Sequence, residues 1–243
     1  MVQSKFVKQI LHTYLIKLIF VLKYTMSHIV FDSPKFKRWK QRVEVSGNII
    51  KDIKILGFVS RDHVNLFGAF LDCKLITPEG VEIPRCVVIG GDSVVIIPVL
   101  TCVEDGEIYT LLVEQQRIVD GSIIREFPSG GISHNRDDLK AVACLEVKEE
   151  LHMDVTFDEL IPLGSGPVMM NPSASGDLAY FFYFERKVPN SFLQKMNGLS
   201  TGCHDDHEYI RVSVQKMSEA ACSCVSSLLI GTKLLEKAMN RVF

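Results

Sequence analysis

The sequence predicts an α/β protein with a smaller antiparallel β-domain at its N-terminal end. Residues 43–100 carry β-branched and aromatic runs between charged or glycine-containing turns, with no helical periodicity. Helical segments are predicted only later, up to about Leu151 and again over 218–240, with strand-like runs between them. We therefore expect a β-domain at 43–92 and an α/β domain at 93–243 that pack closely together.

Turn residues separate the predicted strands. Thr77-Pro78-Glu79-Gly80 is typical of a hairpin turn, because proline and glycine supply the backbone angles that tight turns need. Residues 93–100 form an apolar run typical of a buried strand, and 109–115 continue as its partner after the polar turn at 104–107. Two further strands are predicted, around 180–185 and 209–214.

One helix is predicted with a defined start. Arg136-Asp137-Asp138 can cap a helix that runs to about Leu151, because aspartate accepts the free amides of the first turn and suits the helix dipole. At about 100° per residue, Cys144, Val147 and Leu151 lie away from the acidic stripe of this helix. These apolar side chains can pack on the sheet.

That acidic stripe consists of Glu146, Glu149 and Glu150, which fall within an arc of roughly 100°. The three carboxylates repel one another unless positive charge lies among them, and a hard divalent cation such as Mg²⁺ would bind them through oxygen. The tight loop 128–131 can bring its backbone to the same place. A charged helix face is often only a solvated surface, so the interpretation depends on its neighbours.

Composition narrows the class of partner. The formal net charge is −2, so no overall positive field favours nucleic acid or an anionic membrane, and neither is expected as a partner. A phosphate-bearing substrate would have to meet local cations or a metal. Seven cysteines are present, and Cys222 and Cys224 are too close for a zinc knuckle. We interpret the cysteines as reduced thiols of a cytoplasmic protein, with the mitochondrion as the alternative compartment.

Residues 1–42 are treated as an N-terminal extension. The apolar stretch 10–22 contains Lys17 and is too short and too charged to span a membrane. Two interpretations of its first 25 residues remain open: a targeting segment, or a sequence upstream of a true start at Met26. The basic run around Phe36 and Trp39 is interpreted as a solvated surface segment rather than a base-stacking site.

Residues 131–153 resemble the signature of the Nudix hydrolases, written G-x5-E-x7-R-E-U-x-E-E-x-G-U with U an aliphatic residue. The leading glycine, the Glu-Val-x-Glu-Glu core and the last apolar position match. Asp137, Leu145 and His152 stand where the signature has glutamate, arginine and glycine. A register counted from Gly130 with one inserted residue fits equally well.

Further motifs resemble the ADP-ribose and ADP-sugar pyrophosphatase branch of that family. They are Val113-Glu114-Gln115-x-Arg117, Glu126-Phe127-Pro128-Ser129-Gly130, the segment 171–177 and the acidic segment 205–212. Together the similarity covers roughly residues 45–240. The resemblance implies a Nudix α/β/α sandwich after the N-terminal β-domain, and a homodimer in which that β-domain pairs two subunits.

The resemblance also implies roles for the acidic residues. Glu146 and Glu150 would be metal ligands, together with the Ser129 carbonyl, or the Gly130 carbonyl in the other register. Glu149 would be a further ligand or a catalytic acid beside the metal. Glu208, on a later loop, would bind metal or activate water. The implied cofactor is Mg²⁺, with Mn²⁺ as a second choice.

Four other positions are implied to bind substrate: Arg117, Glu126, Gly130 and Gly131. A planar guanidinium suits phosphate oxygens, which assigns Arg117 to the pyrophosphate. The implied reaction is hydrolysis of ADP-ribose or a nucleoside diphosphate sugar, such as ADP-glucose or UDP-glucose, to a nucleoside monophosphate and a sugar phosphate. The substrate is thus the expected partner.

The departures from the signature motivate an alternative. Leu145 cannot form the ion pair that the signature arginine makes with a helix glutamate. His152 replaces a glycine that often ends the helix in the left-handed conformation, which costs a histidine some strain. The alternative function is a catalytically weakened Nudix-fold subunit that binds nucleotide or RNA within a larger complex. A second enzymatic alternative is removal of pyrophosphate from RNA 5′ ends, which the near-neutral charge disfavours.

Overall fold

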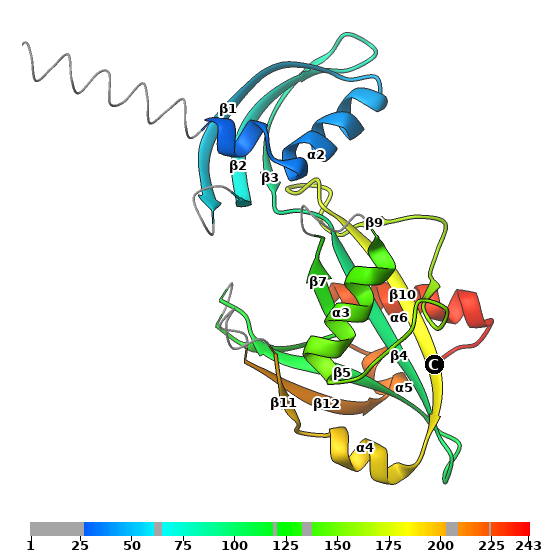
Figure 1. Cartoon of the computed structure of the whole chain (residues 1–243). Helices are drawn as coiled ribbons and strands as arrows, with labels where there is room; N and C mark the ends of the chain where they lie inside the picture. Colours follow the sequence, from blue (N-terminus) through cyan, green and yellow to red (C-terminus); the bar gives the residue numbers. More distant parts are fainter. Residues whose placement is uncertain (1–26, 61–64, 119–120, 133–137, 203–208, 224) are drawn as a thin grey trace, which may run out of the picture. The chain divides into compact units, whose positions relative to one another are not determined.

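The computed structural model describes most of the chain, namely residues 27–60, 65–118, 121–132, 138–202, 209–223 and 225–243. They fall into two compact units (Figure 1). The first unit comprises Met1–Gly91 and Asn171–Gly176, and the second comprises Asp92–Met170 and Asp177–Phe243. In the part of the chain that is described, no helix combines the length and the apolar character needed to cross a membrane.

The first unit is a three-stranded antiparallel sheet with a helix. Its elements are α2 (Pro34–Val45), β1 (Ile49–Ser60), β2 (Leu66–Ile76) and β3 (Glu82–Ile89). The strands lie in the order β1-β2-β3. The hairpin turn predicted at 77–80 is confirmed: the Gly80 N–H donates to the Thr77 carbonyl at 2.9 Å, and Gly80 has a φ of 81°.

Helix α2 covers the inner face of this sheet. Ser33 accepts the Phe36 N–H at 3.2 Å as the helix N-cap, and Pro34 occupies the first turn, where it is tolerated. The side chains of Phe36 and Trp39 are only 5% and 6% exposed and pack with Leu71 in the core. The solvated surface segment predicted here is therefore wrong. The two aromatic residues are three positions apart and share the buried side of the helix, while Lys40 is exposed.

The second unit contains a mixed sheet of nine strands within its described residues. They are β4 (Ser93–Cys102), β5 (Ile108–Gln116), β6 (Ile123–Glu126), β7 (Ser129–Gly131), β8 (Ile161–Pro162), β9 (Val168–Met169), β10 (Leu178–Val188), β11 (Ser200–Thr201) and β12 (Ile210–Lys216). The main order is β11-β12-β5-β4-β10-β8, while β6 pairs with β5, β7 with β4, and β9 with β10. Strands β4 and β10 are parallel, whereas the other paired strands run antiparallel.

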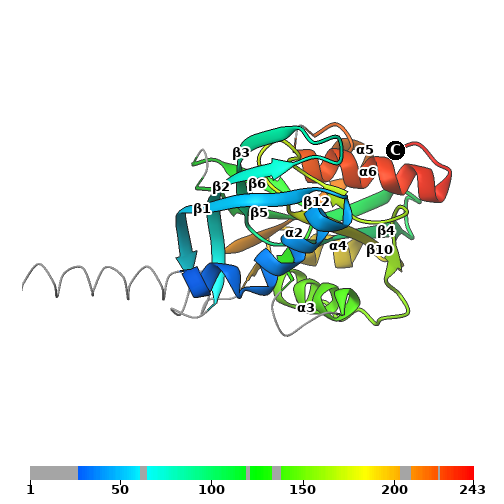
Figure 2. The ribbon, with the colours of Figure 1, turned by 90° about the horizontal axis from the view of Figure 1, so that it is seen from above.

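Helices cover both faces of this sheet. They are α3 (Leu139–Leu151), α4 (Asn190–Met196), α5 (Met217–Ala220) and α6 (Ser226–Met239). Figure 2 shows α3 on one side of the strands and α6 on the other. The predicted helical tail is thus two helices, with a break between α5 and α6.

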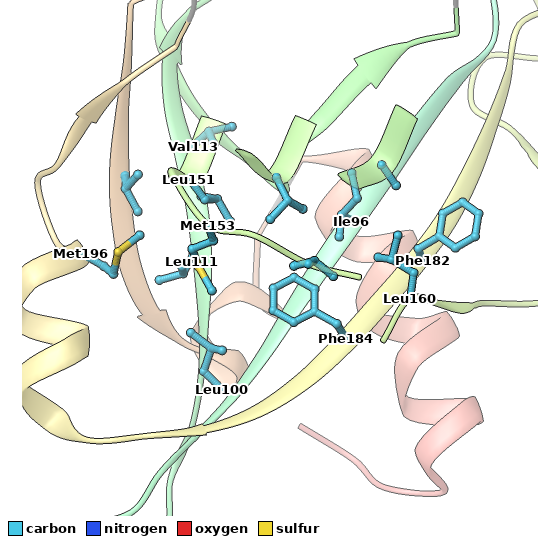
Figure 3. Packing of buried hydrophobic residues seen from close by; sticks show 14 of the residues in the cluster. Ile96, Leu100, Leu111, Val113, Leu151, Met153, Leu160, Phe182, Phe184 and Met196 are labelled. Carbon is cyan, nitrogen blue, oxygen red and sulfur yellow. The ribbon is translucent and has the colours of Figure 1, made fainter. Parts of the chain in front are cut away.

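Two hydrophobic clusters fill the space between these layers. Ile96 and Ile97 are neighbours in β4 and are both fully buried, but they belong to different clusters because successive strand residues point to opposite faces. Ile96 belongs to the same cluster as Leu151 of α3 and Phe184 of β10, and all three are labelled in Figure 3. Ile97 lies in the cluster on the α6 side. The predicted α/β/α sandwich with a smaller N-terminal sheet is confirmed.

Candidate active site

Strand β7 supplies the backbone part of the candidate site. Its three residues pair antiparallel with β4, with Ser129 opposite Val95 and Gly131 opposite Ser93. The Pro128 carbonyl accepts the Ile96 N–H at 2.8 Å just before this strand. The backbone of residues 128–131 is therefore fixed to the central sheet rather than left as a free loop.

Helix α3 is held at both of its ends. The predicted cap is confirmed at Asp138, whose carboxylate accepts the amides of Lys140 at 2.9 Å and Ala141 at 3.3 Å. The helix ends at His152, which has φ 51° and ψ 37° and so adopts the predicted left-handed conformation. Between these caps, Val147 is fully buried against the sheet. The helix register, and with it the direction of each glutamate, is set by these contacts.

Glu150 is a buried acid at the end of this helix. The residue is only 6% exposed, and its Oε2 accepts the Ser129 N–H at 2.8 Å. Burying a carboxylate is costly unless hydrogen bonds or cations compensate it. The bond to Ser129 joins α3 to β7 and fixes where this carboxylate lies.

Glu146 lies one helical turn before Glu150 and reaches the same strand. A Cβ atom added to Gly130 would overlap the carboxyl group of Glu146, so any larger residue here would displace the end of that side chain. The same atom added to Gly131 would meet nothing within 4 Å. Gly130 thus has a steric role at the site, and Gly131 has none by this criterion.

The two carboxylates suit a hard divalent cation. Like charges four residues apart on a helix destabilise it, and here both are directed to Ser129–Gly130. Oxygen ligands are what Mg²⁺ and Mn²⁺ prefer. Within the described ranges, however, no three His, Cys, Asp or Glu residues gather into a metal-binding group. Glu208, the predicted distal acid, lies outside the described residues, as does Asp137 of the signature.

Arg117 follows β5 and is bound to another predicted site residue. Its Nε and Nη2 donate to Oε2 of Glu126 at 2.7 and 2.5 Å. Both side chains are partly exposed, at 39% and 21%. Two of the five guanidinium N–H groups are used in this contact, so donors remain for an anionic ligand. The structure thus brings Arg117 and Glu126 together, at the hairpin of β5 and β6.

Sequence reasoning missed two supporting contacts. Arg125 donates to Glu114 at 2.7 Å across the β5–β6 pair, where these two residues are directly opposite. Asp92 is 4% exposed, its carboxylate accepts the Leu178 N–H at 3.0 Å, and its carbonyl accepts the Ile132 N–H at 2.8 Å. Both contacts depend on strand pairing, for which the sequence contains no register signal. Of the segment 171–177 that resembles the family branch, Asn171–Gly176 belongs to the first unit and Asp177 to the second.

Comparison with known proteins tests the family resemblance that these site residues suggest. No family model matches the chain. The sequence is 26% identical over 195 residues to the Arabidopsis thaliana protein "Nudix hydrolase 14, chloroplastic", in an alignment that covers 74% of this chain. The chain is a relative of the Nudix hydrolases. It spans 62% of the length of that curated Nudix protein.

A solved structure has the same fold as this chain. The crystal structure of an ADP compounds hydrolase superposes with a TM-score of 0.53 and covers 80% of this chain and 97% of its own. Sequence identity is 16%, so this likeness concerns the fold. The resemblance inferred from residues 131–153 and the flanking motifs is confirmed, while the individual site residues stay a prediction.

Proposed function

We propose that this Nudix relative hydrolyses the pyrophosphate bond of ADP-ribose or another nucleoside diphosphate sugar, releasing a nucleoside monophosphate and a sugar phosphate. One observation carries the proposal: the buried Glu150 carboxylate is held against Ser129, beside the Glu146 carboxylate that Gly130 accommodates. The names of the two similar proteins, a Nudix hydrolase and an ADP compounds hydrolase, support the same class of reaction.

Mg²⁺ or Mn²⁺ is the proposed cofactor. Glu146 and Glu150 would hold it, with the Ser129 carbonyl from β7 and with Glu208 as a further ligand. When bound, such a cation neutralises charge on the pyrophosphate and lowers the pKa of a bound water. The buried position of Glu150 supports this assignment, because a cation compensates the cost of burying the carboxylate.

Other residues of the chain would orient the substrate and move a proton. Arg117 would donate to phosphate oxygens, and its bond to Glu126 would keep the guanidinium plane in place. Glu149 is partly exposed on the same helix stripe, so it would accept the proton of the attacking water, with Glu208 as the other candidate base. Gly130 and Gly131 would let the substrate approach the β7 backbone.

The proposed assembly is a homodimer. The outer face of the first unit's sheet exposes apolar side chains, among them Phe70 at 45% and Val88 at 40%, which lie directly opposite each other on β2 and β3. Exposed apolar patches on a sheet commonly mark an interface.

For the compartment we propose the cytoplasm, with the mitochondrion as the alternative; the curated relative carries "chloroplastic" in its name.

The test is product formation from ADP-ribose, ADP-glucose, UDP-glucose and a 5′-triphosphate RNA with Mg²⁺ or Mn²⁺. Turnover of one sugar nucleotide should fall more than about 100-fold in Glu150→Gln, because a neutral amide cannot replace a metal-binding carboxylate. The amide oxygen of the substituted side chain can still accept the Ser129 N–H, so the fold should be retained. Glu185→Gln, an exposed position on β10, is the matched control and should keep full activity.

A different result would favour the weakened binding subunit. Leu145 has no polar group with which to hold a neighbouring glutamate, and this feature motivates that alternative. Tight binding of nucleotide or RNA without turnover in either metal would support the alternative and contradict the hydrolase proposal. Equal activity of Glu150→Gln and the unchanged protein would also contradict it.

A further inference from the structure

The C-terminal end of α3 is tied to a strand from a distant part of the sequence. The last carbonyls of a helix have no partner within it. In α3, Thr201 Oγ1 donates to the Glu150 carbonyl at 2.6 Å, and the Gly202 N–H donates to the Glu149 carbonyl at 3.2 Å. The last residue of β11 and the residue after it thus bind the backbone of two adjacent acidic residues of the predicted site.

Thr201 is itself fixed to the central sheet. It lies opposite Ile210 in the β11–β12 pair, and β12 continues onto β5, where Arg211 lies opposite Glu114. The residue is only 5% exposed, so bulk water competes little for its hydroxyl. The hydroxyl therefore sets the Glu150 backbone against the same sheet to which β7 is paired.

Both the side chain and the backbone of Glu150 are therefore hydrogen-bonded to strands of the sheet. Its carboxylate is bound by Ser129 of β7, and its carbonyl is bound by Thr201 of β11. Glu150 is the last residue but one of the helix, where helices fray most readily. The Leu145 side chain, earlier on the same helix, has no polar atom that could restrain a carboxylate.

We propose that Thr201 is a positioning residue for the metal-binding carboxylates of α3, acting through the backbone of Glu150. The inference rests on the proposed function and adds to it a residue that contacts neither metal nor substrate. Loss of the hydroxyl removes this hydrogen bond to the Glu150 carbonyl and lets the last turn move. Because displacement by about 1 Å can cost two orders of magnitude in rate, a small movement suffices.

The test compares three substitutions at Thr201 in the full chain. Thr201→Val keeps the size of the side chain and removes the hydroxyl. We expect Mn²⁺ binding, titrated by electron paramagnetic resonance, to weaken at least about tenfold, and kcat for the best substrate to fall more than KM rises. Thr201→Ser keeps the hydroxyl and should bind Mn²⁺ within about threefold of the unchanged protein. Thr201→Ala substitutes for the valine variant if that variant does not fold.

Thr232→Val is the matched control. Thr232 is 1% exposed and its hydroxyl donates to the Leu228 carbonyl at 2.7 Å within α6, so the same chemical group is lost far along the chain from the acidic residues. It should leave Mn²⁺ affinity unchanged. Equal Mn²⁺ affinity in Thr201→Val and Thr232→Val, or loss of affinity in Thr201→Ser as large as in Thr201→Ala, would overturn the inference. If the unchanged protein and Glu150→Gln bind Mn²⁺ equally poorly, the proposed function fails instead.

Discussion

Helices α2 and α3 are both rich in charged residues, yet only α3 has a charged residue among its buried side chains. Helix α2 exposes Lys37 and Lys40 and buries Phe36 and Trp39. Helix α3 buries apolar residues too, but it also places the Glu150 carboxylate in the interior. Burial of an aromatic ring lowers the free energy of the fold, whereas burial of a carboxylate raises it unless partners are supplied. A charged run is therefore not evidence of a solvated surface until its apolar spacing and its partners are known.

The largest effect expected from this comparison is on stability, at α2. Trp39→Ala should lower the free energy of unfolding of the first unit by about 3–5 kcal/mol, the range for emptying a large core position. Trp39 packs beside Phe36, with ring centroids 5.6 Å apart, and lies so close to Gly176 that a Cβ there would overlap the indole. Urea unfolding followed by circular dichroism measures the change.

Lys40→Ala is the control for that substitution. Lys40 is exposed and its pair with Glu44 joins two half-exposed side chains at 3.7 Å, so the expected change is within about 0.5 kcal/mol. Equal midpoints and slopes of urea unfolding for Trp39→Ala and Lys40→Ala would contradict this prediction. The packing of helix α2 would then contribute little to the stability of the first unit.

The second effect concerns activity, at the β7–α3 contact. Gly130→Ala should leave the fold intact but lower kcat at least about 100-fold, because the new methyl group displaces the flexible end of Glu146 rather than backbone. Steady-state kinetics beside a thermal melt separates the two quantities. Gly166→Ala is the control, since a Cβ there meets nothing within 4 Å. A Gly130→Ala variant with normal kcat would remove Glu146 from the proposed site.

The sequence predicted the local parts of this site because local chemistry determines them. The Asp138 cap follows from residue type and helix position, and the left-handed conformation of His152 follows from its place at the signature's glycine. It did not predict that Glu150 is buried while Glu149 is only partly so, because both lie on one acidic stripe. That difference arises from Ser129, which is 21 residues away and is placed by its pairing with β4.

Dependence on strand pairing also explains why other contacts could not be predicted from the sequence. Arg117 was assigned to phosphate, but its partner Glu126 is found only once β5 and β6 are paired. Thr201 gave no signal at all, since a lone threonine before a glycine matches many turns. In α2 a signal existed in the three-residue spacing of Phe36 and Trp39, but the surrounding basic residues favoured the wrong interpretation. The two helices differ in the contacts that their side chains make with the neighbouring strands, and residue type alone does not reveal those contacts.

The smallest effect expected is at the end of α3. His152→Gly should raise the free energy of unfolding by about 0.5–1 kcal/mol, because glycine adopts the left-handed conformation without the Cβ penalty that histidine carries at φ 51°. Asn240→Gly, at the left-handed end of α6 with φ 48°, should gain less, since asparagine tolerates that region better. Calorimetry of both variants measures the difference. A loss of stability in His152→Gly would mean that the imidazole makes a contact that outweighs its backbone strain, and the end of α3 would then be held by a side chain as well as by Thr201.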